Sequence, residues 1–180
     1  MKDKVNLNEV WELIEEVVSS GGEFSITPNG ISMLPLLRPG LDTVVLVAPD
    51  KIKVGDIVLY RRDSGKFILH RVMYLKNGKF LMSGDNQTGL EYGVTHEHIL
   101  AKVKDMYREG IKVDTQNRQY KKYVKSQLKK GKIARFFDLI SQKVKRKHFD
   151  WSAFLILFMH NITKCFFYLY KVQEWNVNDY

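Results

Sequence analysis

Residues 55–84 read GDIVLYRRDSGKFILHRVMYLKNGKFLMSG, a stretch in which three apolar runs of strand length are separated by two short turns. The runs are rich in β-branched and aromatic side chains, which favour strands. The turns contain Asp-Ser-Gly and Lys-Asn-Gly, residue types that adopt the backbone angles of tight turns. The stretch therefore predicts three successive strands of an antiparallel sheet.

Further strand-length runs lie on either side of this stretch. They read TVVLVAP at residues 43–49 and HILAKVKDMY at residues 98–107, with Pro-Asp and Gly-Asp-Asn as additional turn sequences. Short apolar runs cut by turn residues are typical of mainly β domains. The sequence predicts one such domain over residues 23–117, a folded or barrel-like antiparallel sheet. An N-terminal helix and a C-terminal helical extension are expected to flank it.

Residues 1–22 have the pattern of an amphipathic helix. Two glycines at the end of the segment favour a helix stop there. Several glutamates interrupt the apolar positions, so we expect no secretory signal in this segment. The helix is expected to pack on the β domain through apolar side chains at three- and four-residue spacing. These are Leu7, Val10, Leu13, Ile14, Val17 and Val18.

The C-terminal region, residues 118–180, begins with a strongly basic segment. Between residues 119 and 147 there are eleven lysines and arginines and one acidic residue, Asp138. Apolar side chains are interspersed among the basic ones. This pattern predicts one or two basic amphipathic helices, with a break near Gly131.

A long apolar segment follows at residues 151–172, and His160, Asn161 and Lys164 interrupt it. The segment is long enough to span a bilayer, but a lysine in the middle of a span costs about 2.5–3.5 kcal/mol. Three interpretations stay open: a helix in the membrane interface, a helix packed on the protein, and a true span.

Composition and charge narrow the class of partner. The chain has 180 residues, enough for one main domain with an appendage, and its formal net charge of +9 indicates an anionic partner. The basic segment lacks interleaved aromatic side chains for base stacking, and it directly precedes an apolar segment. Residues 119–172 therefore favour an anionic membrane surface, and no nucleic acid is expected. The single cysteine, Cys165, requires no oxidising compartment.

Residues 30–40, GISMLPLLRPG, follow neither the helical nor the strand period and are interpreted as a shaped loop. Its glycines and prolines are expected to hold the backbone so that the hydroxyl of Ser32 faces a cleft and Met33 enters the core. A serine hydroxyl in such a loop becomes a useful nucleophile when a neighbouring base accepts its proton.

Four short motifs follow one another along the chain. They are G-x-S-M-x-P, formed by Gly30, Ser32, Met33 and Pro35, then GDIVLY at residues 55–60, ILHRV at 68–72 and SGDN at 83–86. In this order they resemble the type I signal peptidase family of serine proteases, to which the self-cleaving repressors of the SOS response are related. The resemblance covers residues 28–103. It implies a serine endopeptidase that removes a leader or signal peptide and uses no cofactor and no metal.

The residue at the base position selects a branch of this family. Bacterial-type members pair the serine with a lysine, whereas endoplasmic-reticulum-type members have a histidine followed by Arg-Val. The matching residues here are His70, Arg71 and Val72, so the chain is similar to the Ser/His branch. Imidazole, with a pKa near ~6.5, accepts a proton readily at neutral pH. The other interpretation of His70 is a core histidine on an apolar strand face.

The remaining site residues are candidates for support of this pair. Backbone N–H groups at Gly30 and Ser32 are candidate donors to an oxyanion, each typically worth about 2.7–4 kcal/mol. Asp85 in SGDN is the candidate third catalytic residue, although a turn aspartate of this kind often caps its own backbone. The family's acid falls a few residues further on, where this chain has Glu91, which is the second candidate. His96 and His98 lack a third ligand at metal-site spacing and are interpreted as a solvated loop.

The chain departs from the family at its N-terminus. Signal peptidases usually have an anchor there, and residues 1–22 do not resemble one. A basic segment ahead of an apolar one keeps the main domain on the cytoplasmic side, so we expect a cytoplasmic protein, or one peripheral on that face of the membrane, with a peptide or protein substrate. Two alternatives stay open: a non-catalytic peptide- or membrane-binding derivative of the same fold, and a self-cleaving regulator.

Overall fold

The computed structural model describes the backbone of residues 7–146 and the side chains of residues 11–142. Within this range it is mainly an antiparallel β-sheet with one helix before it and a longer helix after it, which confirms the predicted fold class. The elements are α1 (Leu7–Ser19), β1 (Phe24–Ile26), η1 (Ile31–Met33), β2 (Thr43–Val47), β3 (Ile57–Arg61), β4 (Phe67–Lys76), β5 (Lys79–Ser83), β6 (Glu91–Val94), η2 (His96–His98), β7 (Ile99–Arg108), β8 (Ile111–Lys112) and α2 (Arg118–Arg146).

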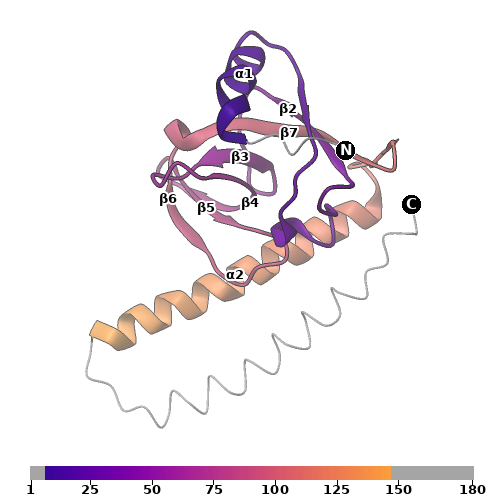
Figure 1. Cartoon of the computed structure of the whole chain (residues 1–180). Coiled ribbons are helices and arrows are strands. Elements are labelled where there is room, and N and C mark those ends of the chain that lie inside the picture. The colour runs from indigo at the N-terminus through magenta and orange to yellow at the C-terminus, as the bar shows by residue number, and fades with distance from the viewer. Residues whose placement is uncertain (1–6, 147–180) are drawn as a thin grey trace.

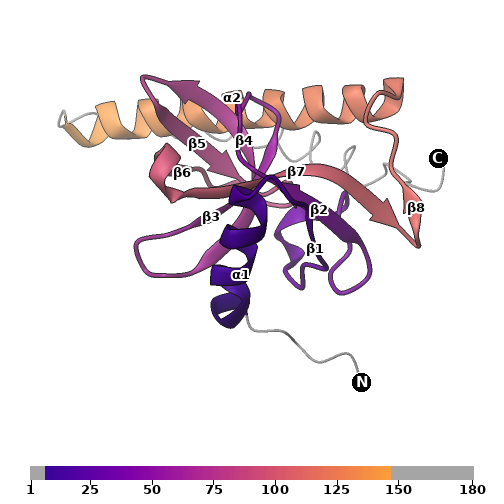
Figure 2. The ribbon, with the colours of Figure 1, turned by 90° about the horizontal axis from the view of Figure 1, so that it is seen from above.

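The strands form one sheet in the order β1-β2-β7-β3-β4-β5-β6, with β8 paired to β7. Every pairing is antiparallel, and β3, β4 and β5 form the three-stranded unit predicted from residues 55–84. Register shifts interrupt four of the pairings. Bulges bend strands and increase their twist, so the sheet is coiled rather than flat (Figure 2).

Buried side chains form a hydrophobic cluster on each side of the β3 strand. Successive strand residues point to opposite faces, so Ile57 and Leu59 belong to the first cluster, together with parts of α1 and the loop after β1. Val58 and Tyr60 point the other way, into a second cluster that includes Val72. Side chains alternate between the two faces along β3 and β4, so polar residues of these strands can contact each other only when they lie on the same face.

The N-terminal helix α1 packs on the sheet through part of the predicted face, whereas Leu13, which was expected to pack there, is 50% exposed. Ile14 and Val18 are almost fully buried in the first cluster. The helix ends where the glycines were expected to stop it. Gly21 has a φ of 83°, and the N–H of Gly22 donates to the carbonyl of Val17 at 2.9 Å.

The C-terminal helix α2 is continuous, so the predicted break near Gly131 is wrong. Gly131 lies where the helix crosses β4. A Cβ built at this position would lie 3.1 Å from the sulfur of Met73. The glycine therefore serves close packing rather than a break, because the surrounding residues favour a helix strongly enough to tolerate it. Figure 1 shows α1 at the top of the view and α2 running along the bottom, and Tyr123 of α2 belongs to the same buried cluster as Ile14 of α1.

Among residues 7–146, no helix combines the length and the apolar character needed to cross a bilayer. The apolar segment at residues 151–172, with its three open interpretations, lies outside the described residues.

Candidate active site

Ser32 lies in the 3-10 helix η1, in the loop that joins β1 to β2. The next residue, Met33, is buried in the first cluster with Leu36 and Leu37, as the loop interpretation predicted. Ser32 itself is half-buried, and its backbone N–H lies in the first turn of η1. First-turn N–H groups have no acceptor inside a helix, so the predicted oxyanion donors at Gly30 and Ser32 are compatible with that role.

Asp42 joins this loop to strand β7 by hydrogen bonds. Its buried carboxylate accepts a hydrogen bond from the backbone N–H of Arg38 at 2.8 Å and a further one from the guanidinium of Arg108 at 3.3 Å. Arg108 also donates to the carbonyl of Leu36 at 2.9 Å. Burial by itself would raise the pKa of Asp42, but the hydrogen bonds from Arg38 outweigh it and hold that pKa below its usual value.

Gly84 brings the two predicted catalytic residues together. A Cβ built on Gly84 would lie 3.0 Å from the Cβ of Ser32 and 3.1 Å from Nε2 of His70. The Cβ of Ser32 and Nε2 of His70 therefore both lie next to this glycine, and these two atoms are no farther apart than the sum of the two distances. The same Cβ would lie 2.5 Å from the carbonyl oxygen of Ser32, so only glycine fits.

The backbone beyond Gly84 also holds the serine loop. The N–H of Asn86 donates to the carbonyl of Ser32 at 2.9 Å, and its side-chain amide donates to the carbonyl of Ile31 at 3.2 Å. The SGDN motif thus holds the backbone of η1 by two hydrogen bonds, and both acceptors are backbone oxygens. These contacts fix the position of Ser32 relative to the loop that follows β5.

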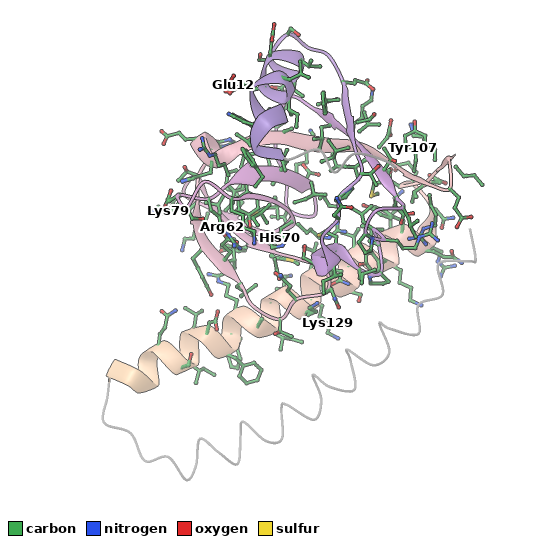
Figure 3. The ribbon with its side chains drawn as sticks, viewed as in Figure 1. Glu12, Arg62, His70, Lys79, Tyr107 and Lys129 are labelled. Atoms are coloured by element: carbon green, nitrogen blue, oxygen red, sulfur yellow. The ribbon has the colours of Figure 1, made fainter. Side chains whose placement is uncertain are left out.

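The other ring nitrogen of His70 meets a hydrogen-bonded chain that the sequence did not indicate. Nδ1 lies 3.2 Å from the hydroxyl of Tyr60, and this hydroxyl donates to Glu91 Oε2 at 2.7 Å. Arg62 holds the same carboxylate, with Nε 2.6 Å from Oε1 and a second contact from its Nη2. His70 and Arg62 lie close together within the sheet (Figure 3).

This chain of hydrogen bonds selects one tautomer of His70. A phenol has a single proton, and Tyr60 donates it to Glu91. The tyrosine oxygen can then only accept from His70, which places the imidazole proton on Nδ1. Nε2, which lies next to Gly84, then carries the lone pair, and a general base requires such an unprotonated nitrogen.

Burial keeps His70 neutral. The ring is 3% exposed, and its removal from water is the main reason why the pKa of His70 falls to about 4, while the charge of Glu91 acts in the opposite direction. Burial would likewise raise the pKa of Glu91, but the hydrogen bonds from Arg62 and Tyr60 keep it below its usual value. Glu91 is therefore ionised, and it can stabilise an imidazolium through Tyr60.

Asp85 binds a different set of partners. Both of its carboxylate oxygens accept from Arg71, at 2.8 and 2.6 Å, and Tyr123 donates to Oδ2 at 2.9 Å. Lys130 of α2 donates to the backbone carbonyl of Asp85 at 2.6 Å. These contacts join β4, the loop after β5 and α2, so Asp85 holds Gly84 in place. Its direct part in a reaction stays a prediction.

Comparison with models of protein families, with curated proteins and with solved structures finds no match to this chain.

A groove lies along the loop between β5 and β6, and neither Ser32 nor His70 is among its lining residues. It has a volume of about 500 Å³ and is lined by Arg62, Met82 and residues 86–91. Asn86, which holds the serine loop, and Glu91, which holds Tyr60, both contribute to its wall. The groove therefore adjoins the site along the loop between β5 and β6.

The two histidines of THEH lie in η2, and His98 lines a pocket of about 280 Å³ together with Tyr60, Arg62 and Glu91. His98 Nδ1 is 2.8 Å from the hydroxyl of Thr95, and its Nε2 is 3.0 Å from a carboxylate oxygen of Asp63. Among the described residues, no group of three histidine, cysteine or acidic side chains is arranged to hold a metal ion. Hydrogen bonds to Thr95 in its own loop and to Asp63 in the turn between β3 and β4 thus account for His98.

Proposed function

We propose that this protein is a serine endopeptidase of the kind that type I signal peptidases represent, with Ser32 as nucleophile and His70 as general base. The observation that carries the proposal is that the Cβ of Ser32 and Nε2 of His70 both lie next to Gly84. If His70 had only a structural role in the core, no serine would be needed near its Nε2.

The reaction follows from the tautomer of His70. Nε2 takes the hydroxyl proton of Ser32 as Oγ attacks the carbonyl carbon of the scissile peptide bond. Backbone N–H groups of η1 stabilise the resulting oxyanion. Nε2 then returns the proton to the leaving amine, and the acyl chain remains on Oγ. Water, deprotonated in turn by Nε2, attacks this ester; as the C–Oγ bond breaks, Nε2 returns this proton to Oγ, which releases the second product and restores the hydroxyl of Ser32.

Tyr60, Glu91 and Arg62 position the base in this proposal. In serine proteases a carboxylate next to the imidazole holds its orientation and stabilises the cation that forms. Here the carboxylate of Glu91 acts through the Tyr60 hydroxyl, and Arg62 fixes Glu91 from the other side. This role supports Glu91 as the candidate third residue, which then acts on His70 through Tyr60 rather than by direct contact.

The proposed substrate is a peptide or protein with a removable leader or signal segment. The groove lined by Met82 and residues 86–91 is the candidate binding region, since its wall includes Asn86, which donates to the carbonyl of Ser32, and Glu91, which accepts from Tyr60. Small ligand sites start at about 300 Å³, so its volume of about 500 Å³ accommodates a few side chains of an extended peptide.

Active-site labelling tests the assignment. We expect a fluorophosphonate probe to modify the wild-type protein at Ser32, as read by mass spectrometry of the labelled peptide. Ser32→Ala removes the label completely, and His70→Ala slows labelling about 100-fold or more, because the base contributes at least that factor. Tyr60→Phe also slows labelling, since Nδ1–H loses its acceptor.

Tyr92→Phe is the matched control for Tyr60→Phe. The Tyr92 hydroxyl donates to Asp138 at an exposed site, so its loss leaves the labelling rate unchanged. Folded wild-type protein without a label on Ser32, or with equal labelling in His70→Ala, contradicts the proposal and favours a binding function for the loop.

A further inference from the structure

The exposed face of α2 carries an unusual arrangement of charge. We name it the outer stripe and define it by eight exposed side chains at three- and four-residue spacing, which therefore lie on one face of the helix. They are Arg118, Lys121, Lys122, Lys125, Lys129, Lys132, Phe136 and Leu139.

The outer stripe has one sign of charge. Its first six members are basic, and within residues 118–142 the single acidic residue, Asp138, accepts a hydrogen bond from Tyr92 of β6. The face toward the sheet is different in character, since Tyr123 and Gln127 are buried there. The stripe runs along about 30 Å of helix, at 1.5 Å per residue. Figure 3 labels Lys129 on the side of α2 away from His70.

The last turns of the stripe are apolar instead of basic. Phe136 is 58% exposed and Leu139 is 45% exposed. Exposed large apolar side chains that continue a basic face are the composition of helices that lie on lipid headgroups. These two residues would gain little from binding a nucleic acid, because it presents phosphates and bases rather than an apolar layer.

We propose that the outer stripe of α2 binds an anionic lipid surface, with its basic residues on the headgroups and Phe136 and Leu139 inserted at the acyl boundary. Charge complementarity carries the choice of partner. The whole chain has a formal net charge of +9, and lysines and arginines next to a membrane bind its anionic headgroups. The sequence after the helix, at residues 151–172, is also apolar.

The position of the stripe has a consequence for the proposed protease. On the inner side of α2, Lys130 contacts the backbone of Asp85, next to Gly84. The stripe and the candidate site are thus separated by the width of one helix, about 10–12 Å. If the proposed function holds, the enzyme on its membrane acts on peptide bonds close to the lipid surface.

Vesicle co-sedimentation tests the lipid surface without reference to catalysis. The full chain carrying Ser32→Ala is mixed with vesicles of phosphatidylcholine, with or without one quarter phosphatidylglycerol. We expect binding to the anionic vesicles that weakens with added salt. Lys121→Gln, Lys122→Gln and Lys125→Gln combined weaken it about 100-fold, or about fivefold per charge. Phe136→Ala with Leu139→Ala weakens it by at least about 10-fold.

The matched control removes the same charge elsewhere. Lys53, Lys66 and Lys79 are exposed lysines outside α2, and their combined replacement by glutamine is expected to change binding less than about fivefold. Equal losses in the two triple variants overturn the proposal, since binding then follows net charge alone. Unchanged binding in the α2 triple variant also overturns it, because the stripe is then covered by residues 151–172 or by a second copy.

Duplex DNA in place of vesicles is the second arm of the experiment. Binding to DNA that is tighter than binding to anionic vesicles at the same salt concentration overturns the lipid assignment in favour of nucleic acid. None of these results depends on Ser32, so the lipid surface and the proposed protease activity are tested separately.

Discussion

Replacing Gly84 by alanine abolishes the reaction at Ser32 in this account. The added Cβ would lie 2.5 Å from the carbonyl oxygen of Ser32, a backbone atom that cannot move alone. The serine loop has to shift away from His70, and a displacement of about 1 Å can cost about 100-fold in rate. We expect labelling of Gly84→Ala by the fluorophosphonate probe to fall at least that far, with circular dichroism showing a folded protein.

Gly89→Ala provides the matched control for this change. Gly89 lies in the same loop, and a Cβ built there has no atom within 4 Å. Its labelling rate is expected to equal that of the wild type. Normal labelling in Gly84→Ala contradicts the arrangement, since Ser32 and His70 cannot both keep their places next to this position once it carries a side chain.

Replacing Arg71 by methionine strongly destabilises the protein. Arg71 is 0% exposed and holds Asp85 with two hydrogen bonds, and it also donates to the carbonyl of Gly55 at 2.7 Å. The substitution leaves the Asp85 carboxylate buried without its counter-charge. Breaking a buried pair in this way typically costs about 3–5 kcal/mol. We expect a loss of that size in the free energy of unfolding, measured by urea denaturation with tryptophan fluorescence.

Two further variants show which interaction causes this loss of stability. Lys104→Gln breaks the ion pair with Glu23, in which both side chains are half exposed, and is expected to cost less than about 1 kcal/mol. Arg71→Met combined with Asp85→Leu removes both charges and is expected to recover part of the stability. A loss in Arg71→Met no larger than that in Lys104→Gln contradicts the structural role of the pair.

The sheet could be predicted where strands carry long apolar runs, and not elsewhere. The five runs quoted from the sequence correspond to β2, β3, β4, β5 and β7. Strands β1 and β8 have only three and two residues, too few for a pattern to emerge. Strand β6 reads EYGV, in which three of the four residues are not buried and one of these three is glycine. Pairing with β5 makes it a strand, and that contact is invisible in one sequence.

Ser32 and His70 could be proposed as a pair from the sequence, but most of the residues that contact His70 could not. Tyr60 ends an apolar run and has the pattern of a core aromatic. Only the register of β3 on β4, in which Val58 is opposite His70, places Tyr60 on the same face as the histidine. Glu91 was a candidate by resemblance, but its link to His70 through Tyr60 depends on this register.

Register also explains the partners of Asp85. Arg71 is opposite Ser83 in the pairing of β4 with β5, so Asp85, two residues further on, can lie on the same side as Arg71. The neighbouring position His70 points to the opposite face. The SGDN motif thus brings Gly84 to the histidine and directs the carboxylate of Asp85 to the arginine.

The pH dependence of Ser32 labelling tests most directly whether a buried, neutral His70 activates the serine. A general base must be deprotonated, and the pKa of His70 is lowered to about 4 by burial. The labelling rate is therefore expected to stay constant from pH 8 to pH 6 and to fall by half as the pH drops through about 4, while circular dichroism shows that the protein remains folded. A midpoint near the ordinary histidine value of about 6.5 contradicts the account, because the imidazole would then be exposed to water rather than held between Ser32 and Tyr60.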